Sequence, residues 1–193
     1  SSDCFDYVYD KVKSNICLSS ISGGTDIVSC FVLGSNILPV YRGELQTRGL
    51  GMSVEVWNES GLPVKEQKGE LVCTKTFPSK PIMFWDDKGR RKYANSYFSR
   101  YPNVWCHGDY VKLMDSDGMI FYGRSDTTLN RGGVRIGTAE IYRQVELLNE
   151  VIESIVVEQN LDDDSRIILF VKLDKDKQLS ATFKEKIVNQ IRS

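Results

Sequence analysis

Two short polar segments of this 193-residue sequence carry side chains suited to binding a phosphorylated ligand. The first, Ser22–Ile27, is a glycine-containing turn that offers backbone N–H groups, the hydroxyl of Thr25 and the carboxylate of Asp26. Such a turn can meet a phosphate together with a magnesium ion, because N–H groups bind phosphate oxygens and Mg²⁺ prefers oxygen ligands. An ordinary turn capped by an aspartate has the same residue types, so this segment alone leaves both interpretations open.

The second segment, Trp105–Asp109, places an acid where a hairpin is expected to begin. A carboxylate there can accept two hydroxyl hydrogen bonds, as a ribose would offer, although a turn-capping role is the simpler alternative. His107 is the only histidine, and no serine or cysteine nucleophile motif accompanies it. We therefore interpret His107 as a structural loop residue and exclude a hydrolase, which would need a nucleophile elbow and a histidine base.

A third segment, Gly123–Ile141, is more specific than the other two. It reads Gly-Arg-x-Asp, a short connection, Gly-x-Arg, and a helix that opens with Gly-Thr-Ala-Glu-Ile. This pattern resembles the hinge motif of the adenylate-forming superfamily, which includes acyl-CoA synthetases, peptide-synthetase adenylation domains and luciferase. Together with Gly69–Leu71, which opens a predicted strand, the two polar segments follow the order and approximate spacing of that superfamily.

Within that superfamily, the sequence specifically resembles the acetoacetate–CoA ligases. The resemblance runs from Phe5 to the last predicted helix, becomes generic after about Val151, and is carried by three segments: Leu18–Ile27, Leu38–Gln46 and Trp105–Tyr110. It implies the C-terminal part of an enzyme that converts acetoacetate, ATP and CoA to acetoacetyl-CoA, AMP and pyrophosphate through an acyl-adenylate. The phosphate loop of such enzymes is expected upstream of Ser1 and their catalytic lysine downstream of Ser193, so we expect the chain alone to be inactive.

The resemblance also implies roles for individual residues. Thr25, Asp26 and Arg135 would be catalytic, and Asp26 would help to hold Mg²⁺, through water because its side chain is short. The nucleotide, ATP or AMP, would be bound by six residues: Gly23, Gly24, Thr25, Asp109, Arg124 and Arg135.

Two further roles concern specificity and motion. Acetate-specific relatives place a bulky tryptophan at the position of Gly23, so glycine here implies a larger acyl pocket. Asp126 would be the hinge about which a C-terminal domain moves between the two half-reactions.

Two other functions stay open. One is a sibling ligase for acetate or propionate; Gly23 and the His107–Asp109 run favour acetoacetate instead. The other is a non-catalytic, truncated interaction module, against which the retention of Asp109, Arg124 and Arg135 argues.

Composition excludes several classes of function. Hydrophobic residues make up 41% of the sequence, charged residues 26%, and the net charge is −1, so no basic surface for nucleic acid or membrane is expected. No apolar run is long enough to span a bilayer. The five cysteines include no CxxC pair, which argues against a zinc site or a disulfide framework and favours reduced thiols in the cytoplasm.

The predicted fold class is α+β. Residues 1–123 should form the β-rich, barrel-like end of a large AMP-binding domain, residues 124–127 the hinge, and residues 128–193 an incomplete, mobile α+β domain. Alternation and turn signals predict strands at 16–21, 52–56, 69–73, 110–113 and 119–122, and later at 151–158 and 166–172. Helices are predicted near 3–12, from an N-cap at Thr138, and over 182–191 with a capping box at Thr182 and Glu185.

Overall fold

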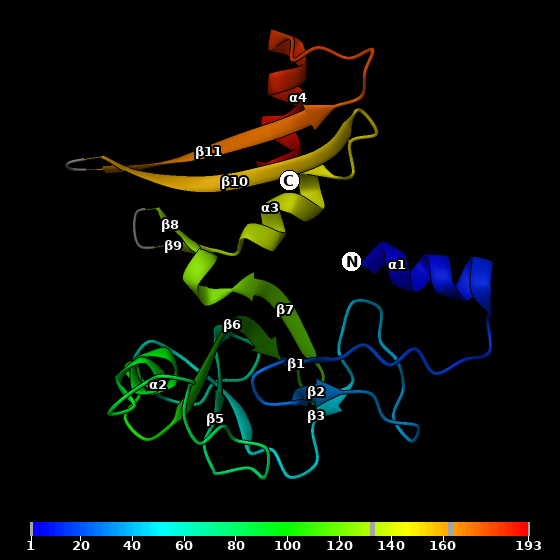
Figure 1. Ribbon diagram of the computed structural model, residues 1–193. Helices are drawn as coiled ribbons and strands as arrows, with labels where there is room; N and C mark the ends of the chain where they lie inside the picture. Colours follow the sequence, from blue (N-terminus) through cyan, green and yellow to red (C-terminus); the bar gives the residue numbers. More distant parts are fainter. Residues whose placement is uncertain (1, 132–133, 162–163, 193) are drawn as a thin grey trace. The chain divides into compact units, whose positions relative to one another are not determined.

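The computed structural model describes residues 2–131, 134–161 and 164–192. The chain divides into two compact units, Ser1–Phe121 and Tyr122–Ser193 (Figure 1). Both units combine helices with strands, and the described strands pair into open sheets. The fold is therefore mixed α and β, while the barrel-like closure that the resemblance implies is not confirmed by these pairings.

The first unit contains two antiparallel sheets. The smaller has the order β1-β2-β3, formed by β1 (Ser22–Gly24), β2 (Ser29–Leu33) and β3 (Thr47–Arg48). The larger has the order β4-β5-β6-β7, formed by β4 (Val54–Trp57), β5 (Lys68–Cys73), β6 (Trp105–Leu113) and β7 (Met119–Arg124), whose last three residues belong to the second unit. Helix α1 (Ser2–Tyr7) continues as a π-helical turn over Val8–Val12, and α2 (Arg91–Tyr97) lies between β5 and β6 in the chain.

Burial follows from the sequence pattern of these strands. In β4, Val54 and Val56 are buried and alternate with partly exposed neighbours, as expected for a strand with one face on the core. Strand β5 is buried almost throughout, because β4 and β6 flank it on both sides. The core of the first unit also includes Phe31 of β2, Trp105 and Met119.

The second unit is built on a long hairpin of β10 (Val151–Leu161) and β11 (Asp164–Leu173). A short hairpin of β8 (Leu129–Arg131) and β9 (Val134–Ile136) precedes it, and α3 (Thr138–Val145) packs against β10 and against α4 (Ala181–Arg192). The core of this unit joins both helices to the hairpin through Ile141, Val145, Val156 and Ile187.

Most predicted elements are confirmed, including the hairpin around residues 114–118 and the strands β4, β5, β10 and β11. The strand predicted at 16–21 is wrong: those residues form no strand and none is buried, and the first strand is β1, inside the small-residue cluster. A run of apolar and small residues met the strand pattern, but only the segment that pairs with β2 becomes a strand.

Both predicted helix caps are shifted towards the N-terminus. Gly137, not Thr138, caps α3, and its N–H donates to Oε1 of Glu140 at 3.0 Å. Helix α4 begins at Ala181, where the Oγ of Ser180 accepts from the N–H of Phe183 at 3.2 Å. In each case the residue that caps the helix lies one or two positions before the predicted threonine. No helix in the described part of the chain is long and apolar enough to cross a membrane.

Candidate nucleotide-binding site

The turn between β1 and β2 carries the predicted phosphate-binding residues. Ile27 is fully buried, and its N–H donates to the carbonyl of Gly24 at 3.2 Å and to Oδ1 of Asp26 at 3.1 Å. Thr25 and Asp26 are exposed beside it. The buried isoleucine therefore anchors the turn to the core, while the hydroxyl and the carboxylate stay open to solvent.

Close backbone packing explains the two glycines before this turn. A Cβ atom on Gly23 would lie 2.7 Å from the Cα of Cys30 in β2, and one on Gly24 would lie 3.0 Å from Cε1 of His107. Because real Cβ atoms do not approach backbone this closely, a side chain at Gly23 would push β1 away from β2. Glycine here serves the packing of the strands in addition to any role in a ligand pocket.

Asp26 is oriented from helix α2. The hydroxyl of Tyr97 donates a hydrogen bond to Oδ2 of Asp26. The Tyr97 ring in turn stacks on Trp105, with centroids 3.7 Å apart and planes 13° from parallel. Since Trp105 is buried at the start of β6, the aspartate is linked to the core through two aromatic rings.

His107 lies beside the same tryptophan. The indole Nε1 of Trp105 donates to Nδ1 of His107 at 3.4 Å, and because an indole can only donate, Nδ1 acts as an acceptor. The neutral ring then carries its proton on Nε2, which lies 3.4 Å from the carbonyl oxygen of Gly23. The loop location predicted for His107 is wrong: the residue is 7% exposed and lies within β6.

Asp109 is brought next to this histidine. Its Oδ2 lies 3.8 Å from Nε2 of His107, and the residue is only 8% exposed. The strand is irregular between the two residues, where its register with β5 shifts and Gly108 has a φ of 82°. The first unit therefore gathers Gly23, Asp26 and Asp109 around Trp105 and His107.

The surroundings of Asp26 fit a magnesium ion held through water. Each carboxylate oxygen accepts one protein hydrogen bond, from Ile27 and from Tyr97, and the residue stays exposed. Among the described residues, no group of three or more His, Cys, Asp or Glu side chains is arranged to hold a metal. A single carboxylate suits Mg²⁺, which usually keeps several waters and takes its other ligands from substrate phosphates.

The other predicted residues belong to the second unit. Nε of Arg124 lies 3.5 Å from Oδ1 of Asp126, and both side chains are exposed. The intervening segment, Ser125–Thr127, is a single 3₁₀ turn in which Oγ1 of Thr127 donates to the carbonyl of Arg124 at 3.0 Å. Arg135 is part of β9, but its side chain lies outside the described residues.

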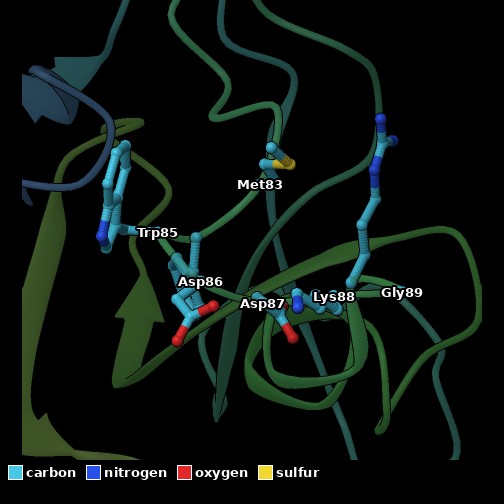
Figure 2. Close-up of a pocket in the computed structure, with 8 residues that line it drawn as sticks. Met83, Trp85, Asp86, Asp87, Lys88 and Gly89 are labelled. Atoms are coloured by element: carbon cyan, nitrogen blue, oxygen red, sulfur yellow. The ribbon is translucent and has the colours of Figure 1, made fainter.

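A hollow of the first unit is formed by the loop before α2 and contains none of the predicted residues. It has a volume of about 680 Å³, and Figure 2 shows Met83, Trp85 and Asp87 around it. The Asp87 oxygens accept from the N–H groups of Lys92 at 3.0 Å and Tyr93 at 2.8 Å. Its carboxylate is thus used to hold the first turn of α2, the helix that carries Tyr97.

Burial alone would raise the pKa of the Asp87 carboxyl, but the N–H donors of Tyr93 and Lys92 outweigh it and leave the pKa below its ordinary value. The carboxylate is therefore the form that the fold stabilises.

Tyr97 is the site residue that the sequence patterns missed. The segment Arg91–Tyr97 is short and polar, so no helix was predicted there. The signal that would have found it is the spacing of four between Tyr93 and Tyr97, which places both rings on one face of a helix. Tyr93 and Tyr97 indeed pack together, with ring centroids 5.6 Å apart.

The sequence of the chain is similar to those of several known proteins. No family model matches the chain. It is 53% identical over its whole length to the acetoacetyl-coenzyme A synthetase of Rhizobium meliloti and 50% identical over 99% of its length to the acetoacetyl-CoA synthetase of Gallus gallus. The chain spans 30% and 28% of those two proteins, which is less than a third of their length.

Solved structures agree with these relatives. The acetoacetyl-CoA synthetase from Streptomyces lividans superposes with a TM-score of 0.89 at 40% identity, over 98% of this chain and 29% of that one. An anthranilate CoA ligase, AuaEII, solved with anthranoyl-AMP, superposes with a TM-score of 0.75 at 15% identity, over 96% of this chain and 35% of that one, and shares the fold alone. Over its whole length, this chain is a homologue of part of the acetoacetyl-CoA synthetases, members of the adenylate-forming superfamily.

Proposed function

We propose that this chain is part of an ATP-dependent acetoacetate–CoA ligase and supplies the ribose- and phosphate-binding side of its nucleotide site. The observation that carries the proposal is the convergence of Gly23, Asp26 and Asp109 on one aromatic cluster, in a chain 53% identical to an acetoacetyl-coenzyme A synthetase. Those three residues come from segments about 80 positions apart. Their meeting in one place supports a shared ligand.

The first half-reaction joins two anions, the acid and the α-phosphate of ATP, so catalysis rests on positioning and charge neutralisation. The exposed hydroxyl of Thr25 would donate to a phosphate oxygen. Asp109 would accept hydrogen bonds from ribose hydroxyls, and its near-complete burial beside the protonated Nε2 of His107 fixes its position. Arg124 and Arg135 would contribute guanidinium donors, whose fixed fork matches phosphate oxygens.

Mg²⁺, when bound, would neutralise phosphate charge, and Asp26 would hold it through water. CoA would enter in the second half-reaction, in which its thiol attacks the acyl carbonyl and AMP leaves. No step of either half-reaction uses the thiols of this chain, and its five cysteines form no disulfide among the described residues. Thiols of this kind support a reducing compartment, and we place the enzyme in the cytoplasm.

The acyl pocket would be bounded by Gly23. The position of a Cβ on Gly23 is taken by the backbone of β2, so acetoacetate is supported over the shorter acetate and propionate by the relatives named above. The relatives named above do not favour either alternative function, the acetate or propionate ligase or the non-catalytic module.

Asp126 would be the hinge between a large domain ending near residue 123, whose end forms the expected barrel-like subdomain, and a mobile domain from residue 128 onwards. The single 3₁₀ turn over Ser125–Thr127 supports this role, because few hydrogen bonds must break for its backbone angles to change. In the full-length protein, Asp126→Pro should slow one half-reaction much more than the other. Equal losses in adenylation and in thioester formation, measured separately, would argue against a hinge.

The function is tested with the full-length protein that contains this chain. Release of AMP is measured with ATP, CoA and each of acetoacetate, acetate and propionate. The proposal predicts the highest kcat/KM for acetoacetate. A higher value for acetate or propionate would identify a sibling ligase, and no acid-dependent AMP release would leave only a non-catalytic role.

A further inference from the structure

We propose that Tyr97 is a positioning residue for the nucleotide site, acting through the carboxylate of Asp26. The hydroxyl of Tyr97 donates to Oδ2 of Asp26, while Oδ1 accepts from the N–H of Ile27 at 3.1 Å. With one donor on each oxygen, the plane of the carboxylate is fixed. The inference rests on the proposed function, because that function requires the Asp26 carboxylate to be oriented so that it holds Mg²⁺.

The position of Tyr97 is itself firmly set. Its ring stacks on Trp105 with centroids 3.7 Å apart. It also packs edge-to-face with the rings of Phe84 and Tyr93, whose centroids lie 5.7 and 5.6 Å from its own. Trp105 is 2% exposed and belongs to the core of the first unit. An exposed carboxylate on a turn is thus held by a hydroxyl whose ring cannot easily move.

Orientation matters more for Asp26 than for a longer acid. A short side chain that reaches Mg²⁺ only through water must present its free lone pairs in a fixed direction, because the bridging water has to meet the carboxylate and the ion at once. In metal sites such hydrogen bonds to the ligand usually change affinity as well as geometry. Removing the Tyr97 hydroxyl should therefore weaken binding of ATP in the presence of Mg²⁺ and leave Mg²⁺-free binding unchanged.

Helix α2 offers a matched control. Tyr93 lies one turn earlier, and its hydroxyl donates to the carbonyl of Pro81 at 2.6 Å, away from Asp26. Tyr93→Phe and Tyr97→Phe therefore remove the same group from the same helix, and both keep their ring contacts. Only the second removes a donor from the carboxylate.

The experiment uses full-length wild type, Tyr97→Phe, Tyr93→Phe, Asp26→Ala and the double variant Asp26→Ala/Tyr97→Phe. Calorimetry measures the Kd of ATP with excess Mg²⁺ and with a chelator, and thermal unfolding measures Tm. For Tyr97→Phe we expect a rise of roughly 3- to 10-fold in the Mg²⁺-dependent Kd, the size of one lost hydrogen bond. Tyr93→Phe should match wild type, and Tyr97→Phe should add nothing once Asp26 is alanine.

Several results would overturn the inference: equal Kd values for the two tyrosine variants, a loss that persists without Mg²⁺, or a loss that persists beside Asp26→Ala. A Tyr97→Phe protein that unfolds would do the same, since the hydroxyl would then serve the fold. The proposed function fails separately, if wild type binds no ATP or if Asp26→Ala binds it as well as wild type does.

Discussion

Nε2 of His107 lies 3.4 Å from the carbonyl oxygen of Gly23 and 3.8 Å from Oδ2 of Asp109. One imidazole therefore connects the strand that leads into the phosphate-binding turn with the acid expected to hold the ribose. Trp105 fixes which nitrogen carries the proton, because its indole N–H occupies Nδ1. The imidazole ring of His107 therefore separates the two segments and offers an N–H donor at Nε2.

Replacing His107 should weaken nucleotide binding in a way that depends on the replacement. Glutamine keeps an N–H donor at a similar reach, whereas leucine fills space without one. We expect His107→Leu to raise the Kd of ATP by roughly 3- to 10-fold and His107→Gln to raise it less. Calorimetry on the full-length protein checks this, and equal losses in the two variants would show that shape alone matters.

A side chain at Gly23 should cost stability before it affects specificity. The Cβ of Gly23→Ala would collide with the backbone of Cys30, and overpacking of this kind costs about 1–3 kcal/mol. Chemical denaturation measures that cost. If Gly23→Ala left the free energy of unfolding unchanged, β1 and β2 would be able to move apart without cost.

The larger Gly23→Trp variant tests the acyl pocket. It should shift the ratio of kcat/KM values for acetate and acetoacetate towards acetate. This ratio is the correct measurement, because a loss of folded protein lowers both values equally. An unchanged ratio would count against Gly23 as a wall of the pocket.

The buried ion pair of the first unit should be sensitive to the loss of one partner. Glu70 is 1% exposed and its carboxylate pairs with Arg100. Burial and then the negative charge of Glu70 raise the pKa of the nearby Cys106 thiol to about 11. We expect Arg100→Met to destabilise the protein by about 3 kcal/mol, because it removes the cation that pairs with a buried carboxylate.

The double variant Glu70→Leu/Arg100→Met should recover part of that stability, and Arg91→Met, at an exposed position on α2, serves as the control. Urea denaturation gives the three free energies of unfolding. A double variant less stable than Arg100→Met would contradict this account of the pair.

Acid should destabilise the first unit through Asp87. Its folded pKa lies below the unfolded value, which is roughly 3.9. The stability from this group is therefore complete above the unfolded pKa and is lost as pH falls through the folded pKa. Asp87→Asn should flatten the fall of Tm between about pH 5 and pH 2, while the exposed neighbour Asp86→Asn should leave it unchanged. Parallel Tm curves for wild type and Asp87→Asn would refute the role.

The sequence predicted elements whose period or turn residues are strong. Val54 and Val56 alternate, Asp115–Gly118 makes a tight turn, and Ala139, Tyr142 and Val145 recur at helical spacing, so β4, the hairpin of β6 and β7, and α3 were all found. The patterns failed where tertiary contacts decide the outcome. Helix α2 depends on the contact of Tyr93 with Trp105 and on the Asp87 carboxylate, and the spacing of four between Tyr93 and Tyr97 is the periodic signal in its otherwise polar segment.

The site residues divide in the same way, into those that local patterns predicted and those that tertiary contacts decide. Thr25, Asp26 and Asp109 were found because they fall in short motifs. Tyr97 was missed, and His107 was assigned to a loop, because their significance lies in a stack on Trp105 and a hydrogen bond to Gly23. Such pairings join segments that are far apart in the sequence, and local residue order does not encode them.

The most direct measurement is exchange of labelled pyrophosphate into ATP by the full-length protein, with acetoacetate as the acid and no CoA. We predict exchange that requires acetoacetate, and a fall of at least tenfold in kcat/KM for ATP in the Asp109→Asn variant, which keeps its shape but loses one charged acceptor. Absence of exchange in wild type, or undiminished exchange in Asp109→Asn, would contradict the account.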